Sequence, residues 1–225
     1  MATLLAETER VRVFPDVANL PLRPPAMLAK TAASLDVLSG GRFELGLGAG
    51  AFWEGIEAMG GPRRSAGESV DALAEAIEII RLFWSGERAI TYEGRFYTVK
   101  GLHPGPAQAH RIEIWLGAYR PRMLALTGRV ADGWIPSLGY APPETIPERQ
   151  ARIDEAAVAA GRQPAEIRRA YNLPPTPAEE IARFALELGF DTFILWPGED
   201  GVRELERFAA ESVPAVREAV GSARR

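Results

Sequence analysis

The sequence contains no cysteine, and its only histidines are His103 and His110. Without cysteine the chain forms no disulfide, no thiolate metal site, no iron–sulfur cluster and no covalent intermediate on a Cys nucleophile. Two histidines are too few for a His-rich metal site, so we expect no metal. Because no carboxylate stands next to them in the sequence, we expect these histidines to be neither ligands nor bases.

The sequence also lacks a large excess of charge of one sign and lacks long apolar runs. The 26 basic and 30 acidic residues give a formal charge of −4 without any run of like charges, which excludes a basic footprint for nucleic acid or anionic membranes. No apolar stretch approaches the ~18 residues of a membrane helix. The first ten residues lack the apolar core of a signal peptide. We therefore expect a cytoplasmic globular protein.

Hydrolase motifs are absent as well. The sequence has no phosphate-binding Walker loop, no Gly-x-Ser-x-Gly elbow and no His-Glu-x-x-His helix. No residue stands out as a general acid or base, and the catalytic residues remain unassigned.

What is present is an alternation of short apolar runs with longer amphipathic stretches. Strands are expected at residues 11–19, 43–47, 112–116, 131–135, 167–173 and 192–196. Helices are expected at residues 24–39, 70–84, 121–129, 146–160, 179–188 and 202–220, the last bent at Pro214; residues 51–67 are expected to be irregular and residues 89–100 to form a hairpin. This order predicts a parallel sheet covered by helices, and the strand count alone allows a TIM barrel or a doubly wound sheet.

Several motifs in the correct order resemble the bacterial luciferase-like flavin-dependent oxidoreductases, which include luciferase-like monooxygenases and F420-dependent oxidoreductases. The motifs are P-L-R at 21–23, L-D-V-L-S-G-G-R-F at 35–43, L-G-L-G-A-G at 45–50, Y-E-G-R-F-Y at 92–97, L-G-A at 116–118, P-R-M-L at 121–124 and G-R-V-A-D-G-W at 128–134. The resemblance extends from near residue 8 to about residue 220. Together these motifs are specific, whereas each one alone is weak.

The resemblance implies an α/β fold derived from the TIM (β/α)8 barrel. Residues 1–225 would form a single domain that lacks the first two strands of the family, with about six parallel strands and an inserted hairpin. An incomplete barrel exposes two sheet edges, which are prone to pair with another chain. We therefore expect a homodimer.

Small residues mark the end of the second expected strand, at Gly48, Ala49 and Gly50. They let the backbone lie against a flat ring, and the resemblance implies that this ring belongs to FMN or, alternatively, to coenzyme F420. The competing interpretation is a tight turn that requires glycine.

A second cofactor segment is expected where a strand leads into a helix, at Gly117, Ala118, Tyr119 and Arg120. Free N–H groups and the helix dipole favour an anion there, and the resemblance implies the cofactor phosphate. The alternative is a capped loop whose arginines are solvated.

The remaining candidates each have a structural alternative. Ala18 and Asn19 end the first strand, at a position that in this family lies under the ring and can carry a cis peptide; they are equally compatible with a turn. Trp134 is a candidate pocket wall or a core residue. Phe52 and Trp53 are expected to line the substrate entrance, or else to form a surface lid.

The resulting hypothesis is a monooxygenase that uses reduced FMN and O2 on a small organic substrate. The alternatives are an F420-dependent hydride-transfer oxidoreductase and a non-catalytic, flavin-binding barrel remnant. The substrate is not indicated, because fold alone carries no function.

Overall fold

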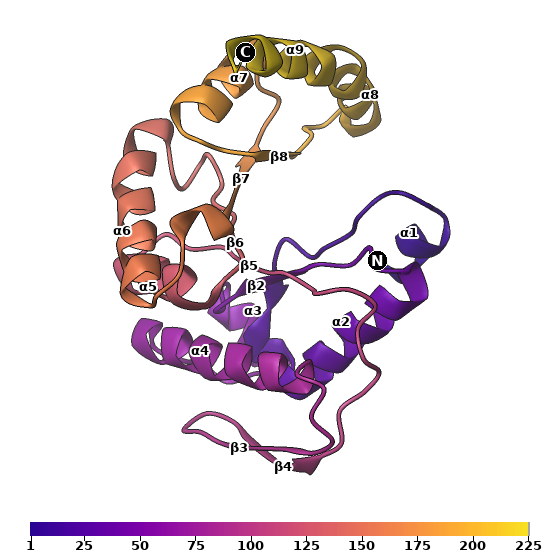
Figure 1. The fold of residues 1–225 in the computed structure, drawn as a ribbon, viewed down its shortest axis with the longest axis vertical. Helices are drawn as coiled ribbons and strands as arrows, with labels where there is room; N and C mark the ends of the chain where they lie inside the picture. The colour runs from indigo at the N-terminus through magenta and orange to yellow at the C-terminus, as the bar shows by residue number, and fades with distance from the viewer. Residues whose placement is uncertain (225) are drawn as a thin grey trace. The chain divides into compact units, whose positions relative to one another are not determined.

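A computed structural model describes residues 1–224 and divides into two compact units, Met1–Gly117 and the part from Ala118 onward (Figure 1). Each unit contains three short parallel strands with helices packed against them. The expected single domain of residues 1–225 remains a prediction, since each unit is compact by itself.

The first unit holds three of the parallel strands and the antiparallel hairpin. Its elements are α1 (Ala2–Ala6), β1 (Ala18–Asn19), the 3-10 turn η1 (Leu20–Leu22), α2 (Pro25–Ser39), β2 (Leu45–Gly48), α3 (Trp53–Ala58), α4 (Ala66–Phe83), β3 (Ile90–Glu93), β4 (Thr98–Leu102) and β5 (Ile114–Leu116). Strand β2 lies between β1 and β5, and all three run parallel. The expected strands at 43–47 and 112–116 are thus present in shortened form.

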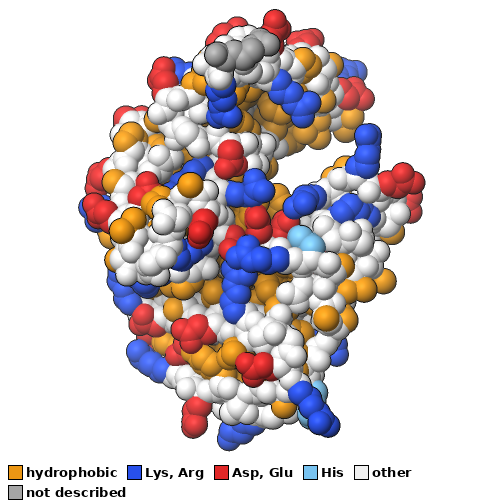
Figure 2. Space-filling view, in the orientation of Figure 1, with side chains coloured by type: hydrophobic (Ala, Val, Ile, Leu, Met, Phe, Trp, Pro, Cys, Tyr) orange, Lys and Arg blue, Asp and Glu red, His pale blue; other side chains and the backbone are white. Residues whose placement is uncertain are grey.

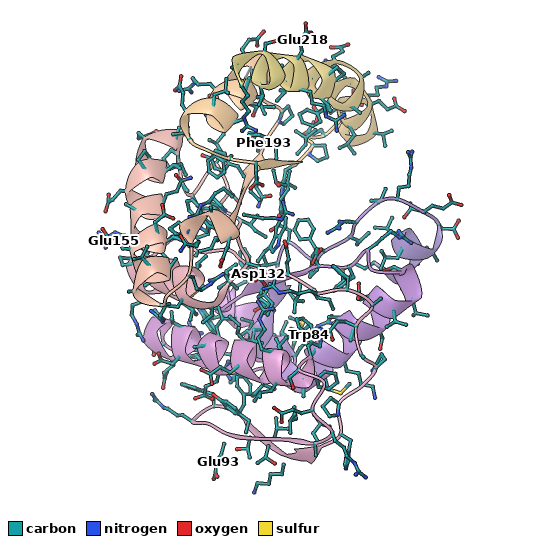
Figure 3. The ribbon with its side chains drawn as sticks, in the orientation of Figure 1. Trp84, Glu93, Asp132, Glu155, Phe193 and Glu218 are labelled. Atoms are coloured by element: carbon teal, nitrogen blue, oxygen red, sulfur yellow. The ribbon has the colours of Figure 1, made fainter. Side chains whose placement is uncertain are left out.

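Helix α2 begins and ends where the sequence indicates. Pro25 occupies the first turn, and Gly40 follows the last turn with a left-handed φ of 67°, which glycine adopts without steric cost. Helix α4 begins four residues before its expected start, because Ser65 and Glu68 form a capping box. The indole N–H of Trp84, labelled in Figure 3, donates to the Ala29 carbonyl at 3.1 Å and joins α4 to α2.

The expected strand at 11–19 is mostly wrong. Only Ala18–Asn19 forms β1, and Val13 makes a single bridge to Phe43. Pro15 interrupts the segment because it has no N–H to donate to a ladder. The stretch at 51–67 also differs from the expectation, since it contains the short helix α3.

The expected hairpin is confirmed by β3 and β4, which pair antiparallel. Its turn is tied to α4 by Glu75, whose carboxylate accepts from the backbone N–H groups of Arg95, Phe96 and Tyr97. A Cβ at Gly94 would meet the Glu75 carboxylate, so a larger residue there would require that side chain to shift.

The second unit continues the alternation of strands and helices. Its elements are α5 (Pro121–Val130), β6 (Gly133–Trp134), the 3-10 turn η2 (Pro143–Thr145), α6 (Ile146–Ala159), the 3-10 turn η3 (Pro164–Glu166), β7 (Arg168–Leu173), α7 (Ala178–Glu187), β8 (Thr192–Leu195), α8 (Gly201–Arg207), the π-helical turn η4 (Phe208–Ser212) and α9 (Val213–Ala223). Strand β7 lies between β6 and β8 in parallel register. Aromatic rings fill its core, and Tyr171 stacks on Phe190 with a centroid distance of 4.4 Å.

The expected last helix is divided rather than simply bent. A π-helical turn separates α8 from α9 and ends just before Pro214. Proline has no N–H for the preceding turn, and a wider turn accommodates this loss. An apolar cavity of about 500 Å³ lies among α7, β8 and α9, and its lining includes Phe193, Phe208 and Val216. Phe193 is labelled on β8 in Figure 3.

The surface is mixed in charge. On the face drawn in Figure 2, basic and acidic side chains are interspersed. Among residues 1–224, no helix combines the length and the apolar character needed to cross a membrane.

Candidate functional site

Parallel α/β folds build ligand sites at the carboxyl ends of their strands. In the first unit the register pairs Asn19 with Gly48, so these two predicted residues lie side by side at the ends of β1 and β2. Strand β5 ends one residue before Gly117, whose N–H donates to the Leu47 carbonyl at 3.4 Å. The first unit therefore brings three of the predicted cofactor positions to one edge of its sheet.

Asn19 carries an unsatisfied acceptor at this edge. Its Nδ2 donates to the Ala51 carbonyl at 3.4 Å, whereas its Oδ1 is buried and has no hydrogen-bond partner among the described residues. A buried polar atom without a partner costs about 1–3 kcal/mol, so it calls for a functional explanation. Upstream of Ala18, the Asp16–Val17 peptide bond is cis.

The hollow beside Asn19 is small. A cavity of about 260 Å³ is lined by Ala18 and Asn19 and by residues of α2 that include Leu28 and Thr31. Small-molecule sites usually have roughly 300–1,000 Å³. This cavity by itself is therefore too small to be the seat of a tricyclic cofactor.

The glycines after β2 are required by packing within the chain. A Cβ at Gly48 would lie 2.8 Å from Val17 Cγ2, and one at Gly50 would lie 2.7 Å from the Trp53 ring. Gly50 also has a φ of +125°, which L side chains rarely adopt. The turn interpretation thus accounts for these glycines, and the approach of a cofactor ring to Gly48, Ala49 and Gly50 remains a prediction.

The two predicted substrate residues differ in their surroundings. Phe52 has a left-handed φ of 57° and its residue surface is 84% exposed at the start of α3. Trp53 turns back toward Gly50 and is half-buried. Phe52 is free to meet a ligand, and contact with a substrate remains a prediction for both residues.

In the second unit, the predicted phosphate loop is held in place by its neighbours. The Arg149 guanidinium donates to the Tyr119 carbonyl at 2.6 Å, and the Tyr119 hydroxyl accepts from the Ser137 N–H at 3.1 Å. Arg120 precedes α5 without a side-chain cap, so the positive end of the helix dipole faces this loop without a side-chain acceptor. The geometry is compatible with anion binding.

A polar pair at the ends of β6 and β7 escaped the sequence analysis. Asn172 Nδ2 donates to Ser137 Oγ at 3.2 Å, and Asn172 Oδ1 is buried without a partner in the described part of the chain. The available signal was an asparagine near the end of an expected strand. Arg149 gave no signal, because it lies on a helix with several other charged residues.

The prediction that Trp134 walls a pocket is not supported. Its side chain is fully buried, its indole N–H donates to the Ala118 carbonyl at 2.9 Å, and its ring stacks on Phe190. Trp134 is a core residue that fixes the backbone of Ala118. Ala118 is itself 1% exposed, so any contribution to a ligand comes through its backbone.

His110 lies between two carboxylates that are distant from it in the sequence, and its expected role as neither ligand nor base remains a prediction. Its Nδ1 lies 2.7 Å from Asp36 Oδ1 and its Nε2 lies 3.0 Å from Glu44 Oε1. Burial opposes the charged form, but the hydrogen bonds and charges of Glu44 and Asp36 outweigh this effect and raise the pKa of His110. The cluster sits at the amino end of β2, away from the carboxyl edge, which indicates a structural role.

Comparison with known proteins identifies the family. Residues 1–194 match the family model described as luciferase-like monooxygenase. The chain belongs to this family. The expected α/β fold derived from the TIM barrel is confirmed by the likeness of the chain to solved structures.

Named relatives use more than one cofactor. The chain is 34% identical over 72% of its length to an F420-dependent glucose-6-phosphate dehydrogenase of Microbacterium testaceum, of which it covers 48%. An F420-dependent secondary alcohol dehydrogenase with an F420–acetone adduct matches 96% of this chain and 83% of its own, with a TM-score of 0.87 and 21% identity. A riboflavin lyase with modified FMN and riboflavin matches 96% and 72%, with a TM-score of 0.83 and 17% identity. FMN and F420 therefore both fit the family.

The chain spans about half the length of the curated relatives it matches. The activities in their names consequently describe those proteins.

Proposed function

We propose that this luciferase-like protein is an oxidoreductase that acts on a small organic molecule with FMN or F420 bound at the carboxyl ends of its strands. The observation that carries the proposal is the buried amide oxygen of Asn19, at the carboxyl end of β1, which has no hydrogen-bond partner among residues 1–224. Both cofactor rings have an N–H on their pyrimidine edge, and such a donor is what this oxygen lacks.

The other predicted residues suit the remaining parts of the cofactor. The backbone of Gly117, Ala118, Tyr119 and Arg120, together with the start of α5, would hold the phosphate. Gly48, Ala49 and Gly50 present backbone without bulky side chains. When bound, reduced FMN supplies electrons for O2 activation and F420 supplies a hydride; the chain binds and orients the cofactor and excludes water.

Two reactions remain candidates. The first is oxygenation of a small organic substrate with reduced FMN and O2, in keeping with the monooxygenase description of the family. The second is hydride transfer with F420, which is favoured by the F420-dependent dehydrogenase that shares 34% identity with this chain. A non-catalytic flavin-binding remnant is the third outcome to be tested.

The deciding experiment is a visible-absorbance titration of the purified protein with FMN and with F420 in separate samples. A spectral shift that saturates with one cofactor, followed by its reoxidation in the presence of substrate, supports the enzyme. After chemical reduction of the bound cofactor, an oxygenated product formed only with O2 identifies the monooxygenase, since reduced flavin is also reoxidised by O2 without any substrate. Anaerobic reoxidation by a carbonyl compound identifies the F420 reaction. Binding without turnover supports the remnant, and binding of neither cofactor contradicts the proposal.

The assembly and location of the protein are further proposals. Strand β1 pairs on one side with β2, and β8 pairs on one side with β7 while its residues stay half-exposed. Pairing of such an edge in a homodimer would remove an aggregation hazard. Light scattering coupled to size exclusion tests this, and a monomer at micromolar concentration contradicts it. The cytoplasmic location is an expectation from composition.

A further inference from the structure

We propose that a pocket in the first unit, which we call the Arg23–Arg64 pocket, binds the phosphate group of a small-molecule ligand. Its polar lining is Arg23, Arg64 and Tyr97, and its apolar lining includes Leu22, Met59 and Pro62. The pocket has a volume of about 300 Å³, which leaves room for an organic portion beside the phosphate.

The two arginines differ from their neighbours in having no carboxylate partner. Arg63 is 2.5 Å from Glu57, and Arg95 is 3.1 Å from Glu68. By contrast, in the part of the chain that the structure describes, neither Arg23 nor Arg64 forms an ion pair. Glu57 and Glu68 thus pair with arginines outside the pocket, and the charge of Arg64 also contributes to the lowered pKa of Glu68.

Arg64 is held ready for an anion. Its guanidinium lies 5.4 Å from the Phe96 ring centre and 5.3 Å from the Tyr97 ring centre, and its Nη1 donates to the Tyr97 hydroxyl at 3.2 Å. A guanidinium fixed on aromatic rings loses little further freedom on binding, and its planar fork suits phosphate oxygens.

Tyr97 adds a donor of its own. Its hydroxyl accepts the hydrogen bond from Arg64, so its proton remains available for an oxygen of the ligand. The apolar side chains beside these groups lower the local dielectric constant, which strengthens a charge-assisted hydrogen bond. The three polar groups therefore form an anion site of the kind that phosphate requires.

The place of the pocket links it to the proposed active site. Its first lining residues belong to η1 and the turn after it, which directly follow Asn19 at the end of β1. The inference therefore rests on the proposed function for the identity of the ligand, whose phosphate would belong either to the substrate or to the cofactor.

The test is calorimetric titration of the intact protein with inorganic phosphate at low ionic strength. We expect saturable binding that weakens with salt, and at least a tenfold weaker affinity in Arg64→Gln. Arg23→Gln and Tyr97→Phe should each weaken binding several-fold. The matched control is Arg63→Gln, a neighbour that is paired with Glu57 and lies outside the pocket lining, and it should bind phosphate as the parent does.

Thermal unfolding is measured for each variant. Because Arg23 is exposed, Arg23→Gln serves as the second test if Arg64→Gln does not fold. Equal phosphate affinity in the parent and in the Arg23→Gln variant, or no binding to the parent, overturns the proposal.

Two further arms identify the source of the phosphate. If Arg64→Gln weakens binding of F420 but not of its phosphate-free deazaflavin ring, the cofactor supplies the phosphate. If it leaves FMN and F420 binding unchanged while inorganic phosphate binding is lost, a phosphorylated substrate is the ligand. Phosphate binding without binding of either cofactor would refute the proposed function and leave the Arg23–Arg64 pocket standing.

Discussion

The two ends of the strands in the first unit differ in whether their buried polar groups have hydrogen-bond partners. At the amino end, Asp36 is completely buried, yet its carboxylate accepts from the N–H groups of Ala109 and His110 and faces the His110 ring. Glu44 beside it binds Arg12 at 2.7 Å and the Glu113 N–H at 2.7 Å. At the carboxyl end, Asn19 keeps a buried oxygen without a partner in the described chain.

This difference indicates that the polar groups at the amino end contribute to stability, whereas the unsatisfied acceptor at the carboxyl end contributes to ligand binding. A network in which each carboxylate oxygen has a donor holds together segments that are far apart in the sequence. Few of its hydrogen-bonding groups are available to a ligand. An unsatisfied acceptor costs stability in the free protein and gains a partner only when a ligand binds. Polar deletions should therefore reduce stability at the amino end and affinity at the carboxyl end.

The largest expected effect is that of Asp36→Ala. It leaves the half-buried His110 ring and the backbone N–H groups of Ala109 and His110 without their acceptor, which costs about 1–3 kcal/mol. Urea unfolding of the variant and its parent measures this. The control is Glu9→Ala at an exposed site, with an expected change within about 0.5 kcal/mol. If Asp36→Ala lowers the free energy of unfolding by less than about 1 kcal/mol, the network does not contribute substantially to stability.

A smaller effect is expected from pH. Only a doubly protonated ring donates to both Asp36 and Glu44, and the pKa of His110 is raised in the folded protein. The contribution of His110 is therefore complete below about pH 6.5, the usual pKa of an unfolded histidine, and disappears as the pH rises through the raised folded pKa.

Urea midpoints between pH 5 and 9 measure this dependence, for which we expect about 1 kcal/mol or less. The slope should flatten in His110→Gln and persist in His103→Gln, since the exposed His103 ring hydrogen-bonds the backbone carbonyl of Arg88. An unchanged slope in His110→Gln would assign the dependence to other groups.

The smallest expected effect concerns Asn19→Ala. Removal of an acceptor that has no partner in the described chain relieves its desolvation cost and loses only the long Nδ2 bond to the Ala51 carbonyl, so the free energy of unfolding should not fall. The affinity for FMN or F420 should fall roughly two- to tenfold, as for one lost hydrogen bond. Visible-absorbance titration and urea unfolding of the same samples provide both numbers. If Asn19→Ala clearly lowered the free energy of unfolding but left the affinity for FMN and F420 unchanged, Asn19 would contribute to stability and not to cofactor binding.

Much of the fold follows from local patterns. Pro25 and Gly40 fix the two ends of α2, and the alternation at residues 89–100 fixes the hairpin. The strand at 11–19 failed because Pro15 breaks the ladder, a signal that was present in the sequence and was outweighed by apolar residues. The early start of α4 was likewise encoded in the capping box of Ser65 and Glu68.

The candidate site was less accessible to sequence reasoning. The pairing of Asn19 with Gly48 follows from strand ends that were expected, although the first strand is shorter. Trp134 was placed correctly on a strand end but points into the core, because side-chain direction depends on the neighbouring Phe190 ring. Ser137 and Asn172, which are 35 residues apart, acquire a meaning only when β6 and β7 are adjacent.

The sequence by itself determined the family, the order of strands and helices, and the positions of the strand ends, since these depend on motifs, periodicity and local turn residues. Only the tertiary structure decided which polar atoms are satisfied. His110 gains two carboxylate partners, whereas Asn19 Oδ1 and Asn172 Oδ1 gain no donor among residues 1–224. The physical reason is that hydrogen-bond satisfaction in a core depends on partners that are distant in the chain and meet only after folding.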